Sequence, residues 1–296
     1  SYFGGERTKF TVETYDRYTP SELIDRLRNF SKHAVGYTKG SAKDYHSHIG
    51  ARDFVGNVSW KGALDLFEKG WTEGREKLVA MAADSGKVDL EVAPAVSLDV
   101  AGYRPDVPLF LTGEPACMQQ ATEQRSKPFL RILFSASYSC RQDETVMNYG
   151  IGLASMIKAF DWAGYSTGVI AEFTSADRHD SDPKRCNRLD LVLKTAGQRL
   201  DIDRLAFVCC HKAMLRRLKF AWMETRFMQR SSETYGSYGH TITPTEAEAD
   251  IVIPSIDNNM EAAESVESAV AYFERVAAGH LSGKSVTDTG RQREVA

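Results

Sequence analysis

The chain has 296 residues, which is enough for one large domain or two small ones. Its composition, 42% hydrophobic and 26% charged, excludes a wholly disordered chain, a collagen-like repeat and a small disulfide scaffold. The net charge of −3 excludes a bulk electrostatic attraction to nucleic acid but leaves a local basic surface open.

Apolar runs and cysteine usage in the sequence indicate the cellular compartment. No run of about 18 apolar residues occurs, and the first residues hold no apolar signal stretch, so we expect no membrane partner. The five cysteines are odd in number and irregularly spaced, which is typical of a reduced intracellular protein. We therefore expect a cytoplasmic location.

The first part of the chain predicts an N-terminal α+β region over residues 1–125. A helix is expected over 19–30, because a threonine cap precedes a proline in the first turn. Two further helices are expected over 59–70 and 71–83, followed over 88–118 by short strands that prolines interrupt. The sequence leaves open whether this region is a separate domain or packs on the sheet that follows.

A different pattern begins near residue 128, where strands alternate with helices. Strands are expected over 130–134, 165–173, 189–193, 205–209 and 250–254, and helices over 143–163, 212–230 and 261–276. This alternation predicts an α/β domain over 126–281 with a mixed, mostly parallel sheet flanked by helices. Residues 282–296 lack an apolar anchor and are expected to be a disordered tail.

The helix expected over 212–230 is the strongest functional signal. Residues 204–230 hold seven Lys or Arg against one Glu. At 100° per residue five of these cations form one exposed stripe, which suits the phosphates of a single strand: Lys212, Arg216, Lys219, Arg226 and Arg230. The predicted contacts are Lys212, Arg216, Arg217, Lys219, Arg226 and Arg230. Alternatively, the stripe pairs with the acidic residues of 245–278, within one chain or between the faces of a homo-oligomer.

The first 54 residues interleave nine aromatic residues with nine Lys or Arg. Bases stack on rings while phosphates meet cations, so this composition favours single-stranded nucleic acid. The predicted contacts are Lys9, Phe10, Arg17, Tyr18, Lys39, Lys43 and Tyr45. The alternative is that about half of these rings belong to the core.

The turn at 135–139, Ser-Ala-Ser-Tyr-Ser, follows the first strand of the α/β part, where open sheets bind ligands. It resembles the Asp-x-Ser-x-Ser metal motif of von Willebrand factor A domains, with Ser137 and Ser139 at the serine positions. Ser135 stands where that family has aspartate. Over residues 129–257 the resemblance implies a degenerate von Willebrand A-like fold, with Ser137, Ser139 and Asp257 as a degenerate metal site. Because Mg²⁺ prefers a carboxylate ligand, we expect no bound metal and no other cofactor. The alternative is a serine-rich turn that caps the next helix.

No catalytic pair is expected. Cys209, Cys210 and His211 end a predicted strand, where adjacent side chains point to opposite faces, so the cysteines are expected to be structural. The chain is therefore predicted not to be an enzyme.

Two segments carry a further resemblance. Trp60-Lys61-Gly62-Ala63-Leu64 and Gly113-Glu114-Pro115-Ala116-Cys117-Met118 look like a phage-associated family of unassigned function, over residues 55–175. Size and charge layout are similar to the single-stranded-DNA-binding RNA polymerase cofactors of N4-related phages. These resemblances imply a viral protein of the host cytoplasm that binds single-stranded DNA and a phage RNA polymerase. The alternative is a von Willebrand A-like protein-interaction module without nucleic-acid binding.

Overall fold

A five-stranded sheet organises the chain. The computed structural model describes residues 10–28, 54–84, 98–99, 104–105, 107–113, 115–116, 118–119, 128–138, 142–176, 184–225 and 249–281. The strands are β1 (Phe10–Tyr18), β5 (Phe129–Ser135), β6 (Ser166–Ala176), β7 (Lys184–Lys194) and β8 (Ile251–Ile253), in the order β1-β7-β6-β5-β8. β1–β7, β5–β6 and β5–β8 are parallel pairs, and β6–β7 is antiparallel. The α/β class and the mixed sheet predicted from the sequence are confirmed.

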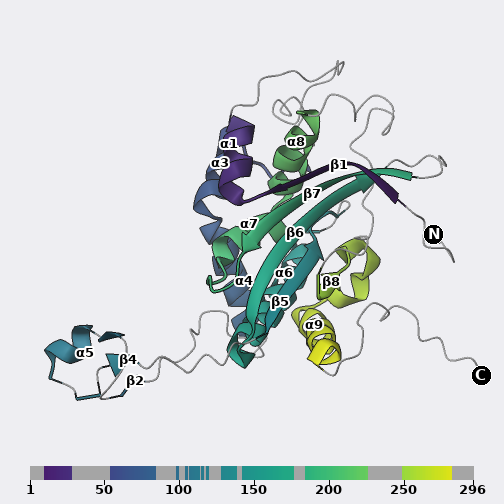
Figure 1. Ribbon diagram of the computed structural model, residues 1–296. Helices are drawn as coiled ribbons and strands as arrows, with labels where there is room; N and C mark the ends of the chain where they lie inside the picture. Colours follow the sequence, from purple (N-terminus) through teal and green to yellow (C-terminus); the bar gives the residue numbers. More distant parts are fainter. Residues whose placement is uncertain are drawn as a thin grey trace, which may run out of the picture.

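Helices cover this sheet. They are α1 (Pro20–Arg28), α3 (Trp60–Lys69), α4 (Thr72–Asp84), α6 (Asp143–Ala163), α7 (Ile202–Cys210), the π-helix η1 (Met214–Lys219), α8 (Phe220–Glu224) and α9 (Val266–Leu281). In Figure 1, α1, α3, α4, α7 and α8 lie together on one side of the long strands. α6 packs against α4, α7 and α9, so the helices form a continuous layer. No helix of the described residues has both the length and the apolar character that crossing a membrane requires.

Short elements follow in the proline-rich stretch. β2 (Leu98–Asp99), β3 (Arg104–Pro105) and β4 (Met118–Gln119) form a second sheet in the order β2-β4-β3. The short helix α5 (Val107–Leu111) lies between β3 and β4 in the sequence. The short strands expected here are thus confirmed, and α5 is an addition to them.

Local capping explains where several helices begin. The Ser59 hydroxyl accepts the Gly62 N–H at 3.0 Å. Thr19 and Glu22 form a reciprocal capping box, in which the Thr19 N–H donates to Glu22 Oε2 at 2.7 Å. Asp201 accepts the Arg204 N–H at 3.0 Å and so begins α7. The helix starts predicted near residues 19 and 59 are confirmed.

The early and late parts of the chain share one core. Leu23, Phe67 and Leu78 belong to the same buried cluster as Phe134 and Trp222. β1 also adds to the edge of the main sheet beside β7. The described residues of 10–84 therefore pack on the α/β sheet, while the boundary expected near residue 125 stays a prediction.

The strand expected over 205–209 is wrong, because these residues form α7. Every residue from Leu205 to Cys210 is buried. A short, fully buried apolar run has no amphipathic period, so its sequence does not distinguish a strand from a buried helix. The Asp201 cap is the local signal that favours the helix.

Candidate functional site

The basic segment that begins at Lys212 is largely interior. Arg216, Arg217 and Lys219 are only 5%, 1% and 1% exposed. They belong to η1, which contacts α3, α7 and α8. Hydrogen bonds from residue i to i+5 widen the turn of a π-helix, so the 100° spacing does not apply there. The expected exposed stripe is therefore wrong at Arg216 and Lys219, and the separately predicted contact at Arg217 is buried as well.

The buried cations contact other parts of the fold. Arg216 Nη1 donates to the Phe54 carbonyl oxygen at 2.9 Å, and its guanidinium lies 4.1 Å from the centre of the Phe54 ring. Lys219 Nζ donates to Ser175 Oγ. Burial lowers the pKa of Lys219 to about 7 and also lowers the pKa of Arg217. Two of these cations thus connect η1 with residues distant in sequence.

The other predicted nucleic-acid contacts are scattered or outside the described residues. Lys212 Nζ lies 2.9 Å from Asp143 Oδ1, in an ion pair. Arg17 is exposed on β1, and Tyr18 is half-buried against the core. The side chain of Phe10 is not described, and Lys9, Lys39, Lys43, Tyr45, Arg226 and Arg230 lie outside the described residues. Single-stranded DNA binding stays a prediction, without the support of a continuous stripe.

The serine turn after β5 meets the turn after β8. Ser255 Oγ donates to the Ser137 carbonyl oxygen at 2.6 Å and accepts the Asp257 N–H at 3.2 Å. Ser137 Oγ accepts the Thr174 N–H at 3.1 Å, which ties the turn to β6 as well. The structure thus brings Ser137 and the segment of Asp257 to one edge of the sheet, while Ser139 lies outside the described residues.

A buried charged cluster lies in the strands beside this turn. Glu172 on β6 is in register with Ser135 on β5 and with Asp190 on β7. Arg188 Nε lies 3.4 Å from Glu172 Oε2, and Arg188 makes two hydrogen bonds to Asp190, at 2.7 and 2.9 Å. The Tyr15 hydroxyl donates to Asp190 Oδ2 at 3.0 Å. Burial raises the pKa of Glu172 to about 7, against the opposing effect of the Arg188 guanidinium.

Sequence reasoning missed this cluster because its members come from three strands. The available signal was the placement of Glu172, Arg188 and Asp190 within or beside otherwise apolar strand segments. Charged side chains are rarely fully buried without a partner, so charges in such segments indicate a polar cluster.

The residues at this edge do not fit a Mg²⁺ site. Position 135 offers a buried hydroxyl in place of a carboxylate, and the hydroxyl oxygens of Ser137 and Ser255 accept backbone N–H groups. Glu172, the carboxylate in register with Ser135, faces the Arg188 guanidinium, which opposes a second cation. Within the described ranges no cluster of three His, Cys, Asp or Glu residues could hold a metal ion.

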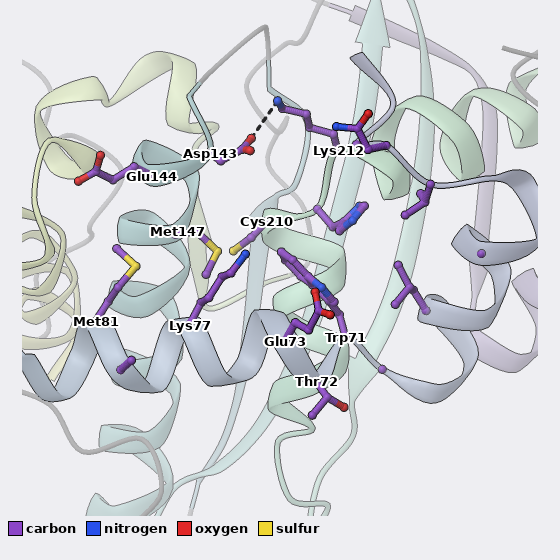
Figure 2. A pocket seen from close by; sticks show the side chains of 18 of the residues that line it. Trp71, Thr72, Glu73, Lys77, Met81, Asp143, Glu144, Met147, Cys210 and Lys212 are labelled. Atoms are coloured by element: carbon purple, nitrogen blue, oxygen red, sulfur yellow. Dashed lines mark ion pairs between the residues drawn. The ribbon is translucent and has the colours of Figure 1, made fainter. Parts of the chain in front are cut away.

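A groove of about 1100 Å³ opens between α3, α4, the first turn of α6 and the end of α7. Figure 2 shows the Lys212–Asp143 ion pair on one side of it and α4 along the other. The His211 ring contacts Trp71 edge-on, with centres 4.7 Å apart, and its Nδ1 accepts the Ala213 N–H at 3.1 Å. Burial lowers the pKa of His211 to about 4, so the imidazole is neutral at pH 7 and carries its proton on Nε2.

The cysteines beside this groove are buried at the end of α7, where a structural role was expected. Cys210 Sγ donates to the Val146 carbonyl oxygen at 3.6 Å. A hydrogen bond with Cys209, together with burial, raises the pKa of the Cys210 thiol. A thiol that stays protonated is a poor nucleophile.

The mixed sheet, its covering helices and the joined turns of β5 and β8 define an α/β protein. A family model described as a domain of unknown function, DUF7192, matches residues 11–277. The chain therefore belongs to this family, whose match extends across both the early helices and the α/β part. Comparisons with curated proteins and with solved structures found no match.

Proposed function

We propose that this chain is a von Willebrand A-like protein-interaction module, whose ligand edge is formed by the turns after β5 and β8. The hydrogen bond from Ser255 Oγ to the Ser137 carbonyl oxygen carries the proposal, because this buried contact fixes the two turns side by side. β5 has β6 on one side and β8 on the other. Ligands of open α/β sheets bind beside such a central strand, at the carboxyl ends of the strands.

The proposed recognition does not use a metal. Ser135 stands at the position where the motif has its aspartate, and the Ser137 hydroxyl already accepts a backbone N–H. The partner is instead recognised at the surface beside the buried serines, through the half-buried Asp257 and the exposed Asn258. Recognition without a metal agrees with the interpretation of the serine turn at 135–139 as a degenerate metal motif.

Single-stranded DNA binding with a phage RNA polymerase as partner is the competing prediction. Its main physical argument was a row of exposed cations, and Arg216, Arg217 and Lys219 are buried. A phosphate backbone requires accessible charge, so the interaction module is the better-supported function.

Site-specific photo-crosslinking tests the proposal. A benzophenone amino acid is placed at Asn258, which is exposed beside the edge, and separately at Trp162, which is 48% exposed near the end of α6. Irradiation in the native host should give one discrete protein adduct from position 258 and not from position 162, and Asp257→Lys should reduce that adduct.

Mass spectrometry of the adduct identifies the partner. Equal adducts from both positions, or no protein adduct from position 258, would contradict the proposal. A labelled oligonucleotide that crosslinks at position 258 would favour nucleic-acid binding instead.

A further inference from the structure

The groove between α3, α4 and α6 combines an apolar floor with an acidic rim. Leu66, Trp71, Met81 and Met147 contribute its main apolar surface. Methionine side chains are flexible and polarisable, so such a floor can adapt to the apolar face of a partner. The groove is separate from the turns of β5 and β8, none of whose residues line it.

Charge on the groove is asymmetric. Its acidic residues are Asp65, Glu73, Asp84, Asp143 and Glu144, and its basic residues are Lys69, Lys77 and Lys212. Lys212 is paired with Asp143, and Lys77 Nζ lies 5.9 Å from the centre of the Trp71 ring. Glu73, Asp84 and Glu144 are exposed, as are Lys69 and Lys77, so the groove lining carries an excess of two negative charges.

The length of the groove suits a helix. α4, which forms one wall, has 13 residues, or about 20 Å along its axis. Figure 2 shows Glu73, Lys77 and Met81 following one another along this wall, with Met147 and Glu144 of α6 on the opposite side. An amphipathic helix of three to four turns has about this length.

We propose that the groove binds an amphipathic, basic helix of a partner protein. The apolar face of that helix packs on Trp71, Met81 and Met147, in the manner of other helix-in-groove complexes. Its Lys and Arg side chains face Glu73, Asp84 and Glu144, which gives the charge complementarity that selects a basic partner. This inference does not rest on the sheet edge, and either surface can fail without the other.

Defined peptides test the proposal on the full chain. The probe is a dye-labelled peptide of about 14 residues, acetylated and amidated, with Leu on one helical face and Lys on the other. One control replaces every Lys by Glu, and a second has the same composition in an order that forms no apolar face. Fluorescence anisotropy should show the basic amphipathic peptide binding at least about ten-fold more tightly than either control.

Substitutions then locate the binding surface. Glu73→Lys combined with Asp84→Lys should weaken binding about ten-fold, because both carboxylates line the groove. Glu76→Lys is the matched control, since Glu76 is exposed on the same helix and does not line the groove. It should change the affinity less than about two-fold. Met81→Asp should weaken binding as strongly as the double substitution, through loss of the apolar floor.

The outcomes separate the two proposed surfaces. Asp257→Lys should leave peptide binding unchanged, because Asp257 does not line the groove. Equal affinity for the three peptides, an equal loss with Glu76→Lys, or no binding at all would overturn the proposal. Circular dichroism of each variant shows whether the fold is retained.

Discussion

Lys219 of η1 donates a hydrogen bond to Ser175 Oγ at the end of β6, although 44 residues separate the two in the sequence. Ser175 in turn donates to Met223 Sδ at 3.6 Å, and all three side chains are buried. No carboxylate within the described ranges forms an ion pair with Lys219, so its ammonium group is stabilised by a hydroxyl and by the Phe220 ring, whose centre is 5.5 Å away. Such an ammonium group is costly to bury.

Lys219→Met should therefore stabilise the protein at pH 6. Burial lowers the pKa of Lys219 from 10.5 to about 7 in the folded state. Between these values the unfolded chain binds more protons, so the wild-type free energy of unfolding rises with pH over this range. Below about pH 7 the buried ammonium is charged and destabilises the folded state. Lys219→Met should therefore have a free energy of unfolding higher than wild type by on the order of 1–3 kcal/mol.

Urea denaturation at several pH values measures this effect. The difference between Lys219→Met and wild type should shrink as the pH rises toward 10. For Lys77→Met, a substitution at an exposed position, the free energy of unfolding should follow the same pH dependence as wild type. Parallel curves for Lys219→Met and wild type would show that the buried ammonium carries no such cost.

Glu172→Gln should remove a pH dependence of the opposite sign. Burial raises the pKa of Glu172 from 4.5 to about 7, so between these values the folded state binds more protons than the unfolded chain. The contribution of Glu172 to the wild-type free energy of unfolding is therefore fully present below about pH 4.5, and it is lost as the pH rises through 7 and the folded carboxyl ionises. At pH 8 the glutamine should be more stable by about 2 kcal/mol, because Arg188 keeps its two bonds to Asp190.

The measurement is again denaturation across pH, with Glu76→Gln as the exposed control. Near pH 4 the Glu172→Gln and wild-type proteins should have nearly equal free energies of unfolding. A loss of stability at pH 8 would mean that the Arg188–Glu172 attraction outweighs the cost of burying the carboxylate.

Features set by neighbouring residues were predictable. The caps at Thr19 and Ser59 act within one turn, and the long strand–helix alternation after residue 128 follows from periods of 2 and 3.6. α7 was missed because a buried run such as Leu205–Cys210 has no polar face to show a period.

Burial of the basic segment was not predictable in the same way. Arg216 donates a hydrogen bond to Phe54, 162 residues away, and Lys219 donates one to Ser175, 44 residues away. The sequence around Arg216 and Lys219 contains no signal for either partner. The turn containing Ser137 could be placed, because the strand before it was recognised. The groove and the Glu172 cluster combine distant elements, so no single segment predicts them.

Ser59→Ala should destabilise the protein by about 1 kcal/mol. The Ser59 hydroxyl accepts the Gly62 N–H at 3.0 Å, and alanine leaves this donor of α3 without its cap. Ser59→Asp retains an acceptor at the same place and should keep wild-type stability. A thermal or urea midpoint for Ser59→Ala equal to wild type would show that water replaces the hydroxyl without cost.

Gly150→Ala should destabilise α6, although alanine is the better helix former by about 1 kcal/mol. A Cβ at position 150 would lie 2.5 Å from Cys210 Sγ, so α6 and α7 would have to move apart. Overpacking of this kind costs about 1–3 kcal/mol, which exceeds the gain in helix propensity. Urea denaturation of the single variants and of Gly150→Ala with Cys210→Ala completes a double-mutant cycle. Removing the sulfur should restore much of the stability lost at position 150, and strictly additive effects would show that this contact does not limit the packing.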